Sequence, residues 1–330
     1  MIGPGLLHAI DVIDVIIVNY RTGPLVVSCL QTLAAEAGEG MRIRAFVIDN
    51  ASGDGSADMI EAAIMQHDWH WARVHRSAVN GGFGAGNNIG IDLALAQAQP
   101  AGLIWLLNPD TRVMPGAARE LARFMAGTPG AGIVGTALLE ADGNLWPFAF
   151  RFPSVLGEIE RGLRWSFTSR LLSRHAIARR MDGRPAVVDW VSGASLAIRP
   201  ALLREGLRFD EGYFLYYEET DLCRAARSNG WQCWYLPQAL VLHIAGQSTG
   251  VTATQARPRR LPDYWFQSRS RYFRKNHGRA YALLADLAWM ISHTIFLGKQ
   301  ALRGSPGIDP PRLLSDFARH SALVPGRRRT

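Results

Sequence analysis

Three acidic residues stand close together at the start of a predicted helix, where they could act on a proton. Glu218, Glu219 and Asp221 follow the aromatic run 213–217 (YFLYY). Acids in a first helical turn stabilise the helix dipole, so capping alone explains one or two of them. A carboxylate held beside aromatic walls can also accept a proton from a hydroxyl group as a general base. The segment is therefore either a capped surface helix or the base of a group transfer.

A fourth acid lies in the tripeptide Asn108-Pro109-Asp110, which ends the apolar run 103–107 (LIWLL). All three are common turn residues, so a strand-to-helix turn is one interpretation. The other is a cation site, because Mg²⁺ binds few carboxylates and shares its remaining positions with phosphate oxygens. His243 ends another apolar run. It is either a satisfied core or loop histidine or a metal ligand together with Asp110.

Residues 80–90 (NGGFGAGNNIG) follow a predicted strand and open a predicted helix. Gly84, Gly86 and Gly90 form the pattern GxGxxxG, which superficially suggests a dinucleotide cradle. However, these glycines follow the third strand rather than the first, and they are mixed with asparagines suited to a ribose or a base. Three interpretations stay open: a nucleotide-sugar contact, glycines that only pack helix against sheet, and a dinucleotide site.

These motifs are positioned by an alternation of strands and helices in the first third of the chain. The hydrophobic periodicity predicts strands at 14–19, 42–49, 71–75 and 103–107, and helices at 24–37, from about 56 to 66 and at 83–98. This order predicts an α/β fold, a mostly parallel sheet covered by helices on both faces. Ligands of such sheets bind beyond the carboxyl ends of the strands, where the polar clusters stand. One pocket is expected to gather them.

The middle of the chain is less regular. Residues 140–186 are interpreted as a loop-rich insertion with one helix at 163–181. After it the pattern predicts a strand-like run at 187–198, a helix from about residue 218 and short strands at 232–236 and 239–243.

The C-terminal part is first basic and then apolar. Residues 257–279 carry seven Arg, one Lys and one acid among aromatic residues, which could form a nucleic-acid patch. The following apolar helix carries a polar stripe, Arg279, Asp286, His293 and Gln300, at every seventh position. A membrane-spanning helix lacks such a stripe. The alternatives are packing against the catalytic domain or a second subunit, and an interfacial helix on a membrane.

The composition limits the class of protein. The 330 residues include 36 Lys and Arg against 28 Asp and Glu, a net charge of +8, which favours anionic partners. Apolar residues make up 48%, which excludes global disorder. Three cysteines without paired metal spacing argue against a disulfide framework and favour a reducing compartment. The first residues show no secretory signal, so a cytoplasmic location is expected.

Taken together and in this order, the segments resemble the family 2 glycosyltransferases, which have the GT-A fold, and most closely a bacterial rhamnosyltransferase-like branch that builds surface polysaccharides. The matching segments are 17–20 (IVNY), 47–56 (VIDNASGDGS), 80–90, 108–110 (NPD), 191–195 (VSGAS), 214–223 (FLYYEETDLC) and 243–248 (HIAGQS). The resemblance implies a nucleotide-sugar-dependent domain over residues 10–250, in which 140–186 is an acceptor or lid insertion. Residues 251–330 would form a basic and apolar helical extension.

The resemblance also assigns roles to residues. The donor nucleotide would be held by Asn19, Tyr20, Asp49, Asn80, Gly82, Phe83, Asn88 and Asn108. Asp110 would bind Mg²⁺ or Mn²⁺ at the diphosphate, and His243 would complete the metal shell. The junction of donor and acceptor would be lined by Trp190, Gly193 and Ala194. Glu219 falls where the family has its catalytic base.

Two departures from the branch affect this site. The chain reads EETDL at 218–222 where the branch usually shows EDxDL. Glutamate has a similar pKa, ~4.3 against ~3.9, but its extra methylene moves the carboxylate by about 1 Å, and such a misplacement can cost ~10²-fold in rate. Either the pocket compensates, or Asp221 or Glu218 shares the role. Asn108 replaces the first acid of the DxD element, which implies weak metal affinity without nucleotide.

The expected function is therefore inverting, metal-dependent sugar transfer, with L-rhamnose from dTDP-rhamnose as the first expectation and UDP- or GDP-sugars as other donors. The acceptor would be a glycan or a polyprenyl-linked glycan, and nucleic acid is not an expected partner. A homodimer and peripheral contact with the inner membrane stay open. The rival interpretations are an NAD(P)-dependent oxidoreductase using residues 84–90 and a non-catalytic sugar-nucleotide-binding pseudoenzyme.

Overall fold

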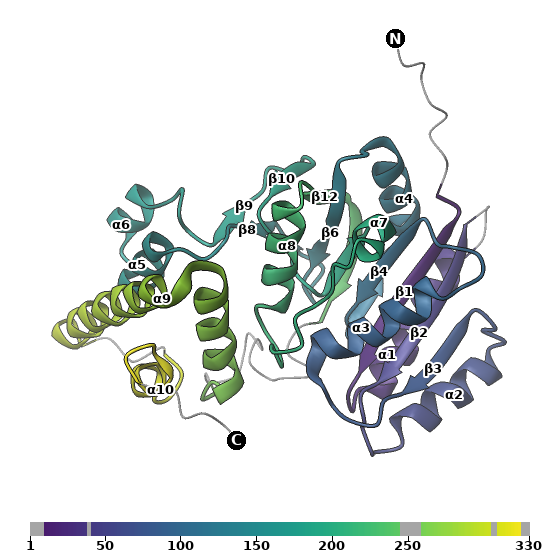
Figure 1. Cartoon of the computed structure of the whole chain (residues 1–330), viewed down its shortest axis with the longest axis horizontal. Helices are drawn as coiled ribbons and strands as arrows, with labels where there is room; N and C mark the ends of the chain where they lie inside the picture. The colour runs from purple at the N-terminus through teal and green to yellow at the C-terminus, as the bar shows by residue number, and fades with distance from the viewer. Residues whose placement is uncertain (1–9, 38–40, 245–258, 305–308, 325–330) are drawn as a thin grey trace, which may run out of the picture.

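The computed structural model describes residues 10–37, 41–244, 259–304 and 309–324 (Figure 1). Its first third has the predicted alternation of strands and helices. The elements are β1 (Val12–Asn19), α1 (Gly23–Glu36), β2 (Arg42–Asp49), α2 (Ser56–Gln66), β3 (Ala72–Arg76), α3 (Gly82–Leu95) and β4 (Leu103–Leu107). The sequence prediction for this part is confirmed to within a few residues at each end.

The middle contains β5 (Thr111–Val113), α4 (Ala117–Gly127), β6 (Ala131–Leu139), β7 (Leu145–Trp146), β8 (Phe148–Phe150), α5 (Val155–Leu163), α6 (Ser166–Leu171), β9 (Ala178–Arg180) and β10 (Ala186–Val188). The predicted helix at 163–181 is wrong. Ser154 caps α5 by accepting from the Gly157 N–H, and Arg164, in the left-handed region at φ 49°, ends it. A short α6 and the strand β9 occupy the rest of that span.

The remaining elements are β11 (Ser195–Ile198), α7 (Pro200–Arg204), α8 (Glu218–Ser228), β12 (Gln232–His243), α9 (Asp263–Leu302) and α10 (Leu313–His320). The run 187–198 is not one strand, because the chain leaves the sheet between β10 and β11. The two predicted strands at 232–243 are one strand, β12, with a register shift between Leu236 and Leu240. The predicted domain boundary at residue 250 and most of the segment 243–248 lie outside the described residues.

The main sheet has the strand order β10-β12-β6-β11-β4-β1-β2-β3. β11 runs antiparallel to β4 and β6, whereas β4, β1, β2 and β3 are parallel to one another. The predicted α/β fold with a mostly parallel sheet is confirmed. Because the carboxyl ends of the parallel strands meet at one edge, Asn19 and Asp49 stand side by side in register there.

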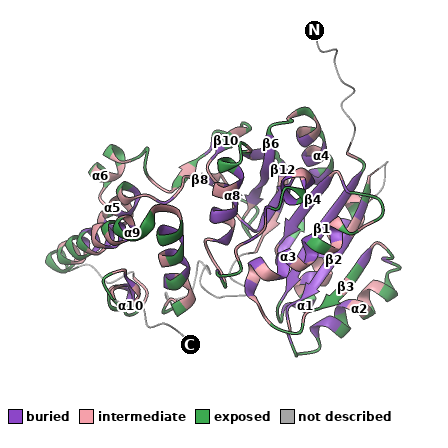
Figure 2. Cartoon of the chain, viewed as in Figure 1, coloured by how far each residue is buried: buried purple, intermediate pink, exposed green. Residues whose placement is uncertain are grey.

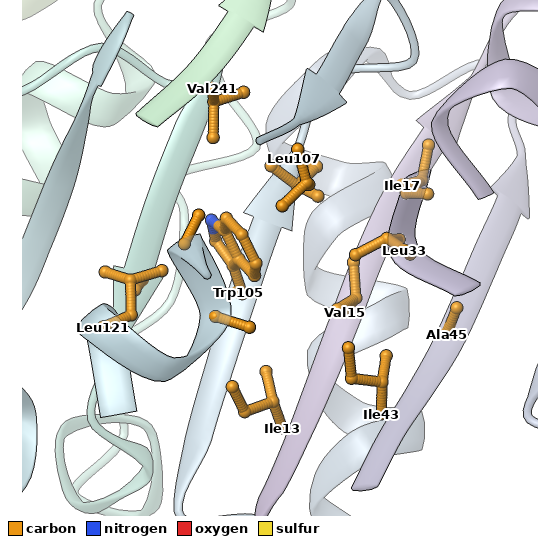
Figure 3. Close-up of a cluster of buried hydrophobic side chains, with 14 of the residues drawn as sticks. Ile13, Val15, Ile17, Leu33, Ile43, Ala45, Trp105, Leu107, Leu121 and Val241 are labelled. Carbon is orange, nitrogen blue, oxygen red and sulfur yellow. The ribbon is translucent and has the colours of Figure 1, made fainter. Parts of the chain in front are cut away.

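Two hydrophobic cores fill the two faces of this sheet. One core lies between the sheet and α1, α2 and α4, and Trp105 is fully buried in it near Leu107 and Leu121 (Figure 3). The other core lies under α3, α7 and α8. Successive side chains of a strand point to opposite faces, so Ile17 belongs to the first core and Ile16 to the second. Cys29, Cys223 and Cys233 are buried and free.

The C-terminal helix α9 bends at Gly278, whose φ is 82°. Beyond the bend it packs against α5, where Gly162 lies so close that an added Cβ would be 2.6 Å from Ser292 Cβ. The predicted polar stripe supplies buried residues to this contact, since Asp286 and His293 are 2% and 1% exposed. The described part of this helix therefore packs within its own chain, as one of the predicted alternatives stated.

Exposed residues remain along α6 and the outer side of α9, in contrast to the buried strands (Figure 2). By length and composition alone, α9 is the one helix among the described residues that could cross a membrane, and 39% of its most apolar window is buried.

Candidate active site

The predicted donor residues at the ends of β1 and β2 form a closed hydrogen-bond network. The Asn19 amide donates to Asp49 Oδ1 at 2.7 Å and to Ser52 Oγ at 3.2 Å, and its carbonyl accepts from the Thr22 N–H and hydroxyl. Asn19 and Asp49 are both buried. They hold the two loops together, whereas the neighbouring Tyr20 is 41% exposed at the same edge.

A second network joins the end of β2 to the start of α3. The Asn50 amide donates to Asn80 Oδ1 at 2.9 Å and to the Gly82 carbonyl at 3.0 Å. Asn50 was missed in the sequence analysis, although its position directly after a buried strand was a signal. Asn88 is used differently, because its amide donates to the Phe209 carbonyl and its oxygen accepts from the Phe209 N–H, both at 3.0 Å. It holds the segment that precedes α8.

The glycines of the 80–90 segment allow close packing. Gly82 has a φ of 87°, and a Cβ there would lie 2.0 Å from the Phe214 carbonyl oxygen. A Cβ on Gly86 would lie 2.7 Å from Val18, and one on Gly90 would lie 2.4 Å from Ile16. Helix packing therefore accounts for Gly86 and Gly90. Gly82 lets the chain approach the loop before α8, and the Phe83 N–H donates to the Phe214 carbonyl there.

Asp110 and His243 come together from different parts of the chain. β5 pairs with the end of β12, which brings His243 Nε2 to 3.4 Å from Asp110 Oδ1. Asp110 is 4% exposed, and this oxygen accepts no hydrogen bond in the described structure. Asn108, two residues before Asp110, links this turn to the start of β11, since its N–H donates to the Ala194 carbonyl at 2.9 Å. The described residues contain no group of three or more His, Cys, Asp or Glu arranged to hold a metal ion.

Glu218 and Glu219 open α8 directly after Tyr216 and Tyr217, which both have a φ of 70°. This unusual turn directs the helix start toward Gly193, where an added Cβ would lie 3.4 Å from Phe83 and 3.7 Å from Glu219 Cβ. The predicted junction residue Gly193 therefore lies beside the predicted base.

Both carboxyl groups at the start of α8 are held in unusual surroundings. Burial raises the pKa of Glu219, although hydrogen bonds from backbone N–H groups, including that of Gly193, oppose the rise. Burial and the neighbouring carboxylate raise the pKa of Glu218. Each residue also has a buried Oε2 atom without a hydrogen-bond partner. A carboxyl group with a free oxygen and a raised pKa is suited to accept a proton from a hydroxyl group.

Asp221 has a different environment. Its carboxylate accepts from Lys275 Nζ at 2.6 Å, from the Asn276 amide at 2.7 Å and from the Tyr213 hydroxyl at 3.3 Å. These contacts tie α8 to the first half of α9. Lys275 and Asn276 were not among the predicted site residues. Of the three candidate acids, Asp221 is the one whose oxygens are fully engaged.

Trp190 contacts residues of the insertion 140–186. Its ring stacks on Phe150 with centroids 4.0 Å apart, and its indole N–H donates to the Arg151 carbonyl at 2.9 Å. The structure thus brings Gly193, Ala194, Asn108, Asp110 and the start of α8 together, and places Trp190 on their border with residues 140–186.

Comparison with known proteins identifies the family of the chain. A sequence model described as "Glycosyltransferase like family 2" matches residues 11–278. The chain belongs to this family and is a glycosyltransferase. The oxidoreductase interpretation is wrong.

The similar curated sequences are rhamnosyltransferases. The N-acetylglucosaminyl-diphospho-decaprenol L-rhamnosyltransferase of Mycobacterium tuberculosis is 29% identical over 247 residues, 73% of this chain and 78% of that protein. The rhamnosyltransferase WbbL of Escherichia coli is 24% identical over 166 residues, 50% of this chain and 61% of that protein. The predicted likeness to bacterial rhamnosyltransferases is confirmed.

Solved structures of glycosyltransferases share the fold. GalNAc-T7 with UDP, GalNAc and Mn²⁺ superposes with a TM-score of 0.58 at 12% identity, covering 95% of this chain and 55% of that one. The mannosyltransferase PcManGT of Pyrobaculum calidifontis with GDP-Man and Mn²⁺ has a TM-score of 0.52 at 15% identity, covering 91% and 77%. At these identities the likeness concerns the fold, which is the predicted GT-A fold.

Proposed function

We propose that this glycosyltransferase moves L-rhamnose from dTDP-rhamnose, with inversion at the anomeric carbon, onto a hydroxyl group of a lipid-diphosphate-linked glycan. One observation carries the proposal. The buried oxygens of Asp110 and Glu219 lack hydrogen-bond partners, while Asn19, Asp49 and Asn88 around them are satisfied. Unpartnered buried carboxylate oxygens are costly to a fold. At Asp110 and Glu219 we assign these free oxygens to a cation and to a reacting hydroxyl group.

The proton transfer is assigned to Glu219. Its carboxylate takes the proton of the acceptor hydroxyl, whose oxygen forms a bond to the anomeric carbon as the bond to the donor diphosphate breaks. The nucleoside diphosphate leaves with that electron pair, and the single displacement inverts the configuration. Gly193 lies beside both Phe83 and Glu219, since a Cβ added there would lie 3.4 Å from the Phe83 ring and 3.7 Å from Glu219 Cβ.

The residues at the Asp110–His243 pair fit a divalent cation, Mg²⁺ or Mn²⁺. Asp110 offers a buried oxygen free of hydrogen bonds, and His243 offers a ring nitrogen 3.4 Å from it. Such a cation, when bound, supplies neutralisation of the charge on the departing diphosphate. The set holds a single carboxylate, as suits Mg²⁺ sites that share their ligands with substrate phosphates. Two structures with this fold contain Mn²⁺ together with nucleotide or nucleotide sugar.

The donor and acceptor follow from the similar enzymes. The mycobacterial relative is named as an L-rhamnosyltransferase acting on N-acetylglucosaminyl-diphospho-decaprenol. We therefore assign this chain to surface polysaccharide biosynthesis in the cytoplasm, with residues 10–250 as the transferase domain and 251–330 as its extension. Peripheral membrane contact and a homodimer stay predictions.

The first experiment measures thermal unfolding with UDP-, dTDP- and GDP-sugars, each with and without Mn²⁺. A ligand at 100 times its Kd stabilises a protein by ~2.7 kcal/mol, so a metal-dependent shift with dTDP-rhamnose is expected. Transfer to a lipid-diphosphate-linked N-acetylglucosamine is then followed by NMR of the new anomeric centre. A retained configuration would overturn the mechanism. Metal-dependent binding with neither transfer nor hydrolysis of any donor would make the protein a pseudoenzyme.

A further inference from the structure

A cavity of about 360 Å³ lies beside the insertion, apart from the Asp110–His243 pair and the acids of α8. It opens between β8, β9 and β10 on one side and the end of α8 with the start of β12 on the other. Its walls combine cationic and aromatic side chains. The residues that matter here are Arg151, Arg179, Arg227, Asp189, Phe150 and Trp231.

The charge of this cavity is not balanced. Asp189 is its one acid, and that carboxylate is already engaged by Arg227 and by the Phe152 N–H. Arg151 donates to the Ala176 carbonyl and Arg179 to the Val187 carbonyl, both at 3.0 Å. Within the part of the chain that the structure describes, neither forms a salt bridge with a carboxylate. Burial and the nearby Arg179 lower the pKa of Arg151, so two cations share this wall.

Guanidinium groups arranged in this way suit a ligand with several anionic oxygens. Arginine offers a planar fork of N–H donors that matches phosphate oxygens in pairs. The guanidinium groups of Arg151 and Arg179 have no carboxylate partner among the described residues, so their remaining N–H donors are available to a diphosphate. A ligand with a single carboxylate would use fewer of these donors.

The cavity lies within reach of the transfer site. Phe150 lines it and stacks on Trp190, three residues before Gly193. On the other side, α8 connects Glu219 to Arg227, eight residues along the helix, or ~12 Å at 1.5 Å per residue. This is a backbone separation along the helix, which the two side chains, one sugar ring and the diphosphate attached to that ring can span together.

We propose that Arg151, Arg179 and Arg227 bind the diphosphate of the acceptor, so that its sugar hydroxyl is presented to Glu219. The inference rests on the proposed function and deepens it by assigning an acceptor subsite separate from the donor site. The ligand chemistry is a diphosphate ester. Free pyrophosphate shares this chemistry, and the test distinguishes the two.

The test compares two acceptors with the same sugar, one a lipid diphosphate and the other an uncharged alkyl glycoside. The double variant Arg151→Gln, Arg179→Gln is expected to raise KM for the diphosphate acceptor about tenfold or more, because charged hydrogen bonds are lost. Its kcat and its KM for the alkyl glycoside should stay within about twofold. The control Arg170→Gln, Arg174→Gln removes two exposed charges from the same insertion outside the cavity. It should leave both KM values unchanged.

A KM unchanged for both acceptors, or raised equally for both, would overturn the subsite. A second variant, Arg151→Lys with Arg179→Lys, keeps the charge and should retain part of the affinity if the first variant folds poorly. Thermal shifts with pyrophosphate test the cavity without any transfer. A shift with pyrophosphate that the glutamine variant loses supports the cavity even if rhamnosyl transfer is absent, which would count against the proposed function alone. Competition of pyrophosphate with the donor instead of the acceptor would contradict the assignment.

Discussion

The buried carboxylates in the two halves of the site differ in their hydrogen bonding. At the ends of β1 and β2, Asn19 and Asp49 are buried and bonded to each other and to neighbouring loops. At Asp110 and the start of α8, by contrast, buried carboxylate oxygens have no partner. A nucleotide pocket benefits from loops fixed before the ligand arrives, because ordering them on binding would reduce affinity. Reacting groups must instead stay available to substrate or metal, which costs stability.

The C-terminal extension shows a third arrangement, in which a buried arginine lies between two buried carboxylates. Arg269 is buried between Glu158, at 2.8 Å, and Asp286. Nearby, Lys275 links Asp210 and Asp221 to α9. Much of the basic segment 257–279 is therefore used inside the molecule to hold α9 against α5 and α8. These ion pairs support the scaffold.

The largest effect is expected for Glu219→Gln, which removes the carboxylate proposed as the base. Sugar transfer should fall by about 10²–10⁴-fold, the usual contribution of a general base, while the metal-dependent thermal shift with donor persists. Both are measured on the same preparation. Glu140→Gln, at an exposed position, is the control. Near-normal turnover of Glu219→Gln, with loss in Glu218→Gln, would move the base to Glu218.

The pH dependence of kcat sharpens the same assignment. Because burial raises the pKa of Glu219, its carboxyl group stays protonated, and unable to act as a base, to a higher pH than an ordinary carboxyl group. The acid limb of the profile should therefore lie above the usual carboxyl range of about 4. A limb within that range would contradict the buried base.

The next effect is expected for Asp110→Asn, which keeps the shape of the side chain but removes the charge facing His243. Transfer should fall by about 10²-fold or more, since a bound cation contributes several kcal/mol to transition-state stabilisation. EDTA should reduce the wild-type rate similarly and have little further effect on the variant. Full activity of the wild type in EDTA would remove the metal from the mechanism.

A stability effect without a direct catalytic one is expected for Arg269→Met. Removing one partner of a buried ion pair leaves uncompensated charge and typically costs about 3–5 kcal/mol of unfolding free energy. Urea unfolding measures this loss, with the exposed Arg274→Met as control.

The pH dependence of stability tests the same cluster. Burial raises the pKa of Glu158, but the charges of Arg161 and Arg269 outweigh burial and lower that pKa. The wild type should thus lose stability as pH falls below the usual carboxyl range. The variant should lose less, because its stranded carboxylates gain by protonation.

The sequence predicted the regions that depend on local hydrophobic pattern and failed for those that depend on contacts between distant parts of the chain. The strands β1, β2 and β4 are short apolar runs with polar ends, so hydrophobic pattern alone locates them and the polar residues at their carboxyl edge. The insertion 140–186 has weak periodicity, and its helix α5 depends on the Ser154 cap and on packing against α9, which begins a hundred residues later in the chain. The residues of the insertion alone do not reveal that it packs against α9.

The same reasoning applies within the site. The pairing of Asp110 with His243 was expected from the resemblance to the family's motifs, and the structure brings the two together through the antiparallel pairing of β5 with the end of β12. The sharing of Asp221 among Tyr213, Lys275 and Asn276 depends on the path of α9, and the arginine cavity depends on how the insertion folds back on α8. Residue type and spacing indicated acids at 218–221. They could not tell which carboxylate is free and which is bonded.

The smallest effect is expected for Asn19→Ala, in the fixed half of the site. The change leaves Asp49 Oδ1 and the Thr22 hydroxyl without their buried partner, which should cost about 1–3 kcal/mol of unfolding free energy. Donor KM should rise several-fold with kcat nearly unchanged, since in the proposed mechanism the loop positions the nucleotide and takes no part in the proton transfer. The exposed Asn144→Ala is the control. A fall in kcat with donor KM unchanged would mean that the two halves are not separable, because the network around Asn19 would then support the reacting groups as well.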